Sequence, residues 1–267
     1  MPEGHTLHRI ARRQRQLFDG QRVAVSSPQG RFAEGAAVVD GMVFDDAQVW
    51  GKHLVQRYRD RRREQLLHVH LGLYGSFTEQ LVPMDEPVGQ VRMRIVGEQN
   101  GVDLRGPTAC ELYTPADLDA LVARLGPDPL RADADPQRAY AAITRSRRPI
   151  GALLMDQKVI AGVGNVYRAE VLFRNGIDPM RAGTSITADE FDAVWSDLVA
   201  LMTIGVRRGR IHVVRAEDDH GAPSYAANRP RTYVYRRAGE ACRICGNPVA
   251  HSELEGRNLF WCPVCQS

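Results

Sequence analysis

Lysine is scarce in this chain of 267 residues, where Lys52 and Lys158 are the only two among 35 basic side chains. Where arginine supplies nearly all other basic side chains, a lysine is present either by chance or because its role requires the donation of a proton. Arginine stays protonated and cannot take that role. Long hydrophobic runs are missing, since no stretch approaches the ~18 consecutive apolar residues of a membrane span. With 43% hydrophobic and 25% charged residues, the sequence predicts a soluble cytoplasmic protein long enough for two domains.

Arginine therefore carries nearly all of the positive charge, and it occurs in clusters. The net charge of +3 and the pI of about 8.7 favour an anionic partner only weakly. Each cluster alone is typical of a solvated surface. Several clusters lie in the second half of the chain, however, interleaved with Tyr225, Tyr233 and Tyr235, and this favours a nucleic-acid surface. The clusters are at 12–15, 61–63, 145–148, 207–210 and 229–231.

Cysteine is also rare, and four of the five cysteines have the spacing of a metal site. Cys242 and Cys245 form one CxxC pair, Cys262 and Cys265 form another, and sixteen residues separate the pairs. Each CxxC pair forms a tight turn, and two of these turns direct four thiolates to one metal, as in a zinc ribbon. Two disulfides are the alternative, which the scarcity of other cysteines and the lack of a signal peptide disfavour. We predict one structural Zn²⁺ with no open coordination position, and we expect Cys110 to be a small buried apolar residue.

The segment between the two cysteine pairs favours a β-hairpin. Gly256 is followed by alternating bulky residues up to Trp261, so Arg257 is expected near the hairpin tip. An arginine on a hairpin that a metal holds in place suits phosphate contact. A solvated arginine is the alternative.

A catalytic terminus is indicated by the first residues of the chain, Met1-Pro2-Glu3-Gly4-His5-Thr6. Removal of Met1 would leave Pro2 as a free secondary amine, whose pKa near ~8 leaves a useful unprotonated fraction at neutral pH. Such an amine attacks an aldehyde-like carbon and forms a charged iminium. Glu3 lies within reach to donate or accept protons. The alternative is a Pro-Glu start without a catalytic role.

Periodicity divides the chain into a β-rich first part and a helical second part. A helix is expected over 7–18, and short strands separated by glycines follow up to about residue 113, which predicts an antiparallel sandwich or barrel. Residues 125–130 have the composition of a linker, and residues 137–210 have helical periodicity. The strands are expected at 23–25, 37–39, 41–44, 66–70, 91–96 and 101–104.

The helical part contains a glycine-rich break at 161–165. We expect Asn165 to cap the helix that follows. Exposed amides at a helix N-terminus bind phosphate readily, although such a break is often a simple turn. Residues 214–231 are polar and rich in Gly, Pro and Asn, which is typical of a mobile loop; its one aromatic residue, Tyr225, is a candidate for stacking on a base.

These features, in this order, resemble the formamidopyrimidine-DNA glycosylase/endonuclease VIII superfamily of base-excision repair enzymes. The resemblance extends over essentially the whole chain, and the helix–two-turn–helix segment and the ribbon are its most specific parts. Gly4 after Pro2-Glu3 is most similar to the endonuclease VIII branch, in an actinobacterial-type member. The motifs are Pro2-Glu3, Gly51-Lys52-His53-Leu54, His70-Leu71-Gly72-Leu73-Tyr74-Gly75, Leu125-Gly126-Pro127, the run from Met155 to Tyr167, and the ribbon ending in Cys265-Gln266.

The resemblance implies a bifunctional DNA glycosylase and AP lyase, an enzyme that also cleaves DNA at abasic sites. Pro2 would attack C1′ of the damaged nucleotide, and Glu3 would help to open the sugar. Lys52 would contact phosphate and donate a proton in β-elimination. Arg257 would grip the phosphates around the lesion and take part in δ-elimination. The implied DNA-binding positions are His70, Leu73, Tyr74, Arg124 and Asn165.

Base flipping leaves a gap in the duplex, and Leu73 and Tyr74 stand where the family inserts wedges into it.

The chain also departs from the family. Thr6 replaces a second glutamate, and Gly72 replaces a polar side chain that fills the gap. Leu259 and Trp261 are unusual in the ribbon motif.

The sequence thus predicts an α+β fold. We expect an N-terminal catalytic β-sandwich with a leading helix at 1–124, a helix–two-turn–helix domain at 125–215, a flexible loop at 216–232 and a zinc-ribbon finger at 233–267. The expected partner is double-stranded DNA with oxidised bases (pyrimidines in particular) or abasic sites, bound by a monomer. A non-catalytic zinc-ribbon protein that binds damaged or abasic DNA is the alternative. A zinc-ribbon protein of the transcription type would not account for the N-terminus.

Overall fold

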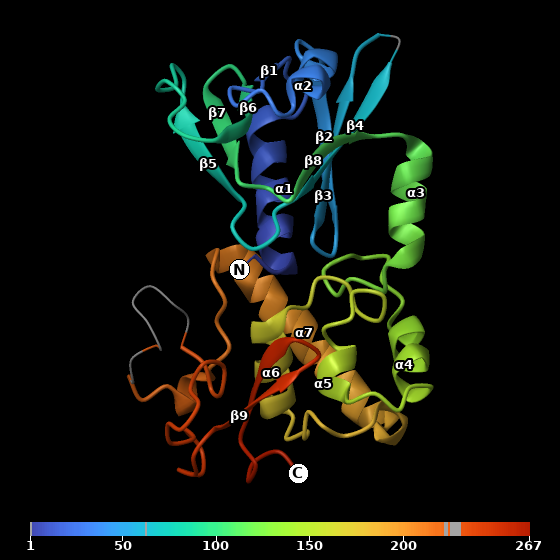
Figure 1. Ribbon diagram of the computed structural model, residues 1–267, viewed down its shortest axis with the longest axis vertical. Helices are drawn as coiled ribbons and strands as arrows, with labels where there is room; N and C mark the ends of the chain where they lie inside the picture. Colours follow the sequence, from blue (N-terminus) through green and yellow to red (C-terminus); the bar gives the residue numbers. More distant parts are fainter. Residues whose placement is uncertain (1, 62, 222–223, 225–230) are drawn as a thin grey trace. The chain divides into compact units, whose positions relative to one another are not determined.

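The computed structural model describes residues 2–61, 63–221, 224 and 231–267, and the chain divides into two compact units, Met1–Arg124 and Leu125–Ser267 (Figure 1). Each unit has its own hydrophobic core. The first unit is mainly antiparallel sheet and the second is mainly helical, which confirms the predicted α+β class. Within the described residues, no helix combines the length and the apolar character needed to span a membrane.

The first unit consists of two four-stranded antiparallel sheets and the long helix α1. The strand order is β1-β6-β7-β5 in one sheet and β2-β3-β4-β8 in the other. Residues of both sheets share one core with Leu7, Ala11 and Phe18 of α1. The elements of this unit are α1 (Gly4–Phe18), β1 (Ala24–Ser26), α2 (Ala33–Val39), β2 (Val43–Trp50), β3 (His53–Arg59), β4 (Glu64–His70), β5 (Ser76–Leu81), β6 (Val91–Val96), β7 (Asn100–Arg105), β8 (Ala109–Tyr113) and α3 (Pro115–Arg124).

The structure corrects the prediction of a strand at 37–39, because these residues form the end of α2. Ala36 and Val39, three residues apart, are the buried residues of this helix. A short apolar run fits a strand or a buried helix equally well, and the alanines around it favour a helix. The helix expected at 7–18 lies within α1, and the strands expected at 66–70, 91–96 and 101–104 lie within β4, β6 and β7.

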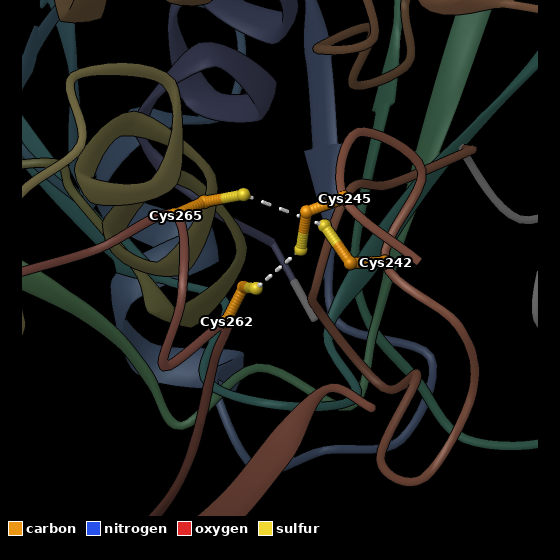
Figure 2. A group of neighbouring side chains, drawn as sticks. All are labelled: Cys242, Cys245, Cys262 and Cys265. Atoms are coloured by element: carbon orange, nitrogen blue, oxygen red, sulfur yellow. Dashed lines mark hydrogen bonds between the residues drawn. The ribbon is translucent and has the colours of Figure 1, made fainter. Parts of the chain in front are cut away.

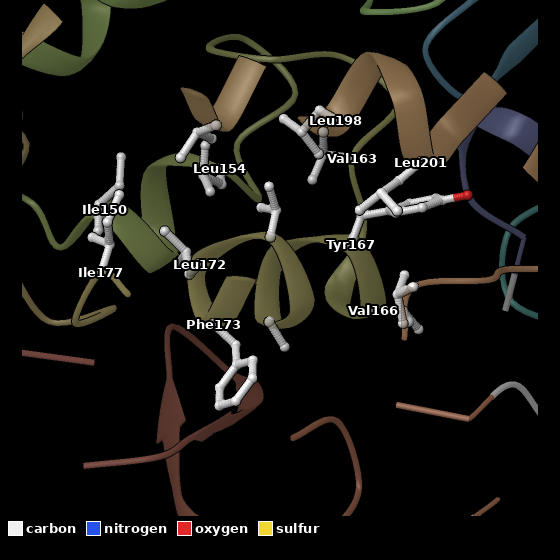
Figure 3. Close-up of a cluster of buried hydrophobic side chains, with 14 of the residues drawn as sticks. Ile150, Leu154, Val163, Val166, Tyr167, Leu172, Phe173, Ile177, Leu198 and Leu201 are labelled. Carbon is white, nitrogen blue, oxygen red and sulfur yellow. The ribbon is translucent and has the colours of Figure 1, made fainter. Parts of the chain in front are cut away.

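The second unit joins the helices and the cysteine hairpin around a single core (Figure 3). The helix α6 is buried on nearly every side, and its Tyr167 and Leu172 are fully buried. Phe260 and Cys262 of the hairpin segment belong to the same core as these helical residues. The elements of this unit are α4 (Pro136–Thr144), α5 (Ile150–Leu153), α6 (Asn165–Arg174), α7 (Ala188–Arg208), β9 (Ala250–Leu254) and β10 (Arg257–Trp261), with short 3₁₀ turns at Gly183–Ser185 and Ala216–Asp218.

The segment with linker composition, 125–130, is largely buried against the helices. The amide of Gly126 donates to the carbonyl oxygen of Gln157 at 2.9 Å, and the amide of Ala161 donates to that of Pro127 at 3.0 Å. A Cβ atom at Gly126 would lie 2.3 Å from the carbonyl oxygen of Val159, so only glycine fits this approach. The Leu-Gly-Pro motif therefore packs as part of the second unit.

Glu170 of α6 fixes the chain where it enters the cysteine-rich segment. Its carboxylate is fully buried and accepts hydrogen bonds from the backbone amides of Tyr233, Val234 and Tyr235 at 2.7, 3.0 and 2.8 Å. Burial raises the pKa of Glu170, although the three amides act in the opposite direction. One side chain of α6 therefore binds three successive residues of the chain ahead of the cysteine-rich segment.

Candidate active site and metal site

Glu3 is the N-cap of α1, which begins at Gly4, and Pro2 directly precedes this cap. Glu3 is fully buried, and its carbonyl oxygen accepts a hydrogen bond from the amide of Thr6 at 2.9 Å. The positive end of the helix dipole favours a carboxylate at this position. His5, which the sequence did not single out, is buried beside it, and burial lowers the pKa of His5 to about 4.

Lys52 occupies a tight turn between β2 and β3. Trp50 and His53 are register partners, so Gly51 and Lys52 form a two-residue hairpin loop. Gly51 has a φ of 62°, a value that glycine adopts without strain at the first position of such a turn. The lysine is thus presented at the end of two paired strands.

Three histidines lie close together beside this turn. The rings of His53 and His70 have centroids 4.8 Å apart, and those of His53 and His68 are stacked at 5.2 Å. Burial lowers the pKa of His53 to about 3, and the positive charges of Arg124 and Lys52, together with those of His70 and His68 where these are protonated, act in the same direction. His70, Lys52 and Arg124, predicted separately from the sequence, therefore belong to one cluster in the first unit.

The loop after β4 presents Leu73 and Tyr74 to solvent. The exposed fractions are 49% and 88%, so two neighbouring large side chains are available at the surface for contact with a partner. The amide of Gly75 donates to the carbonyl oxygen of Leu71 at 2.9 Å and closes the loop. At Gly72, φ is 66° and a Cβ atom would lie 1.9 Å from Oγ1 of Thr108, which explains why this chain has glycine there.

The four C-terminal cysteines form one cluster, as predicted (Figure 2). Their sulfur atoms lie within 4.8 Å of one another, with Cys242 and Cys265 at 3.9 Å and Cys245 and Cys262 at 3.5 Å. A tetrahedral Zn²⁺ with bonds of about 2.3 Å separates its sulfur ligands by roughly 3.8 Å, whereas a disulfide needs about 2.05 Å. The cluster therefore fits a metal ion and not two disulfides. Cys110 is buried, as expected, and burial raises the pKa of its thiol to about 12.

Both cysteine pairs sit in turns of the same kind. The amide of Gly246 donates to the carbonyl oxygen of Cys242, and the amide of Gln266 donates to that of Cys262, both at 3.0 Å. The buried Gln266 side chain accepts from the amide of Cys262 at 2.9 Å and donates to the carbonyl oxygen of Ile177 at 2.9 Å. These bonds preform both cysteine turns and connect the second one to the segment after α6.

The predicted hairpin is confirmed and carries Arg257 as the first residue of β10. Leu254 pairs with Arg257, and the intervening Glu255 and Gly256 have φ values of 48° and 71°, as in a type I′ turn. Arg257 is exposed. Arg148, ahead of α5, binds Glu255 through Nε at 3.0 Å and Nη2 at 2.7 Å, and thereby holds the turn beside Arg257.

Asn165 is not the helix cap that the sequence predicted. Gly164 is the cap of α6, in an extended conformation, and Asn165 is the first helical residue. The Asn165 side chain is buried and its Nδ2 donates to the carbonyl oxygen of Asn258 at 3.0 Å. Nη2 of the buried Arg168 donates to the same oxygen at 2.8 Å, and Arg168 also binds Asn165. The side-chain amide of Asn165 thus connects Arg168 of its own helix to the hairpin that carries Arg257, and it does not cap the helix.

The other residues predicted to contact DNA lie at the end of α3 and in or near the loop at 216–232. Arg124 is the exposed last residue of α3. The predicted flexible loop at 216–232 includes the short 3₁₀ turn, and Asp219 in it forms an ion pair with Arg231 at 2.5 Å. Tyr225 and Arg229 lie outside the described residues.

Comparison with known proteins identifies the protein family to which the chain belongs. The family profile of the formamidopyrimidine-DNA glycosylase N-terminal domain matches residues 1–109, and that of the formamidopyrimidine-DNA glycosylase H2TH domain matches residues 125–216. Endonuclease 8 1 of Mycobacterium tuberculosis (strain ATCC 25618 / H37Rv) is 61% identical over 271 residues, which cover 100% of both chains.

Solved structures agree with this match. The MutM (Fpg) protein of Thermus thermophilus superposes with a TM-score of 0.76 at 29% identity, over 99% of this chain and 98% of that one. The Lactococcus lactis Fpg, solved in complex with DNA that contains an abasic site, has the same fold, with a TM-score of 0.79 at 19% identity over 99% of each chain.

The two sheets, the helix–two-turn–helix segment and the four-cysteine hairpin are thus those of a DNA glycosylase with AP lyase activity. The chain belongs to the formamidopyrimidine-DNA glycosylase/endonuclease VIII family, in the endonuclease VIII branch that includes the mycobacterial relative. The 61% identity to the mycobacterial endonuclease 8 favours this enzymatic function over a non-catalytic binder of damaged DNA.

Acid should destabilise the first unit, and His53 should account for part of the effect. An ordinary histidine has a pKa of 6.5, whereas folding lowers that of His53 to about 3, so the unfolded state takes up the proton first as the pH falls. The free energy of unfolding should therefore be unaffected by His53 above about pH 6.5 and decrease below it. Denaturant unfolding at about pH 7.5 and about pH 5 should show a smaller pH dependence for His53→Asn than for the parent chain. An equal pH dependence in both would contradict this assignment.

Proposed function

We propose that the chain removes oxidised bases, pyrimidines in particular, from double-stranded DNA and cleaves the strand at the resulting abasic site, as a monomer in the cytoplasm. The observation that carries the proposal is the position of Pro2, directly ahead of the buried Glu3 at the start of α1. Once Met1 is removed, the amine of Pro2 attacks C1′ and the bond from C1′ to the base breaks. Glu3 exchanges the protons that sugar opening requires.

Strand cleavage follows from the iminium. In β-elimination, water takes up the proton lost from C2′ and the bond from C3′ to the 3′ phosphate breaks, with Lys52 donating a proton to the departing phosphate. Arg257 grips the phosphates and assists the later δ-elimination, in which the 5′ phosphate leaves. The exposure of Arg257 at the start of β10 and the turn position of Lys52 support these roles.

DNA contacts are assigned to both units. His70 and Arg124 bind phosphate beside Lys52, and the exposed Leu73 and Tyr74 fill the gap that a flipped base leaves. Asn165, the first residue of α6, contacts a DNA phosphate, because the backbone amides at the N-terminus of a helix favour an anion. One Zn²⁺, bound by Cys242, Cys245, Cys262 and Cys265, stabilises the hairpin that carries Arg257.

Borohydride should trap a covalent adduct between the protein and DNA with an abasic site, because the Pro2 amine forms a reducible Schiff base. An extra residue ahead of Pro2, or Pro2→Gly, should sharply reduce the yield of adduct on a denaturing gel. Lys52→Ala serves as the comparison and should retain trapping. If instead Pro2→Gly traps normally and Lys52→Ala does not, the nucleophile is Lys52.

Loss of one cysteine ligand should remove both metal and DNA binding. Cys245→Ser is expected to contain no zinc and to bind abasic DNA weakly, because the hairpin that presents Arg257 loses its metal. Zinc content by mass spectrometry and DNA affinity by fluorescence anisotropy measure the two effects, with Cys110→Ala as the control that keeps both. Full DNA affinity in a zinc-free protein would show that the hairpin does not need the metal.

The preferred lesion can be decided by competition. The chain should excise 5-hydroxyuracil faster than 8-oxoguanine in single-turnover reactions on duplexes with the natural opposite base, in keeping with its place in the endonuclease VIII branch. Segment 214–231 agrees with this, since it offers few apolar residues to cover a bulky purine. Faster excision of 8-oxoguanine would reverse the lesion preference and leave the role of Pro2 unchanged.

A further inference from the structure

One face of the β2-β3-β4-β8 sheet carries a chain of hydrogen-bonded polar side chains. In the strand register, His53 of β3 lies opposite His70 of β4, and His68 of β4 lies opposite Glu111 of β8. Side chains alternate along a strand, so these four share one face of the sheet. Their neighbour Leu54 belongs to the opposite face, which packs in the core. We refer to His53, His68 and Glu111 as the histidine relay.

The hydrogen bonds of the histidine relay have a fixed direction. Nδ1 of His68 lies 3.2 Å from Oε1 of Glu111, and Nε2 of His68 lies 2.9 Å from Nδ1 of His53. An ionised carboxylate only accepts, so Nδ1 of His68 donates to it. A neutral His68 then accepts at Nε2, and Nδ1 of His53 must donate. Both rings are therefore held in the Nδ1–H tautomer, and the lone pair of His53 is on Nε2.

The rings of the histidine relay are neutral near pH 7. Burial is the main reason for the lowered pKa of His53 and of His68, although Glu111 acts in the opposite direction on His68. Tyr113 stacks on His68 with the ring centroids 4.4 Å apart and covers it from β8. The charged and titratable groups that face the relay are Lys52 in the β2–β3 turn, His70 on β4, Glu111 and Tyr113 on β8, and Arg124 on α3.

We propose that His53 and His68 are positioning residues for Lys52 and His70 in strand cleavage, a role that rests on the proposed function of Lys52. His53 directly follows Lys52 and begins β3, and its bond to His68 ties this end of the hairpin to β4. Glu111 extends the tie to β8. Neutral rings hold the turn in place without adding a charge that would repel the Lys52 ammonium.

Glu111 gives the sharpest test, because its side chain is 56% exposed and its replacement leaves the core intact. Glu111→Ala removes the acceptor of His68, whereas Glu111→Gln keeps an oxygen that can accept the same hydrogen bond. Glu64→Ala is the matched control, since Glu64 lies on the same sheet with a 49% exposed side chain and pairs with Arg57. Two rates are measured on abasic DNA in single turnover: Schiff-base formation by borohydride trapping, and β-elimination by strand cleavage.

Glu111→Ala should slow β-elimination by roughly 10- to 100-fold, as expected when a positioned group loses its support. Schiff-base formation and the thermal midpoint should remain close to those of the parent chain. Glu111→Gln should restore most of the elimination rate, and Glu64→Ala should match the parent chain. Elimination at the parental rate in Glu111→Ala, or an equal loss of both steps with a lowered thermal midpoint, would overturn the proposal.

A spectroscopic measurement tests the relay independently of the reaction. Long-range proton–nitrogen NMR spectra of the parent chain should show His53 and His68 in the Nδ1–H tautomer, and Glu111→Ala should lose this signature while Glu111→Gln keeps it. An Nε2–H tautomer at His68 in the parent chain would contradict the relay. Lys52→Ala, measured alongside, separates the two claims: normal elimination in that variant would refute the role of Lys52, whereas slow elimination there beside a normal Glu111→Ala would refute the relay alone.

Discussion

The start of α1 fixes the position of the amine on which the proposed chemistry depends. Gly4 and His5 are buried in the first turn of the helix, and Leu7 and Phe18 anchor the same helix in the core of the first unit. Pro2 is therefore joined to a rigid element through the fully buried Glu3. A nucleophile on such a support loses little further freedom on reaching the transition state, an advantage that a free amine in solution lacks.

The second unit achieves rigidity by a different route, through hydrogen bonds to backbone atoms. The carbonyl oxygen of Asn258 accepts hydrogen bonds from two side chains of α6. Glu170 of the same helix accepts hydrogen bonds from three backbone amides ahead of the cysteine-rich segment. A buried carboxylate with three donors costs far less than one left without partners. The helix α6 therefore acts as the support for the hairpin of Arg257, and the cysteine cluster completes it.

Much of this organisation could be predicted from the sequence, and the failures have physical causes. The periodicity of α1, the runs of β4 and β6 and the spacing of the four cysteines were sufficient to predict those features. The run at 37–39 was misassigned because three apolar residues fit a strand or a helix equally well. The sequence motif identified Asn165 but not its bond to Asn258, 93 residues further along the chain. The histidine relay was missed because it depends on the register of three strands, which local patterns do not encode.

The central claim, that the amine of Pro2 is the nucleophile, is tested most directly by locating the bond that it forms. After borohydride reduction of the complex with abasic DNA and digestion with trypsin and nuclease, mass spectrometry should find the remnant of the sugar on the peptide that spans residues 2–9, attached to the nitrogen of Pro2. A remnant on a peptide that contains Lys52, with the peptide of residues 2–9 unmodified, would contradict the account.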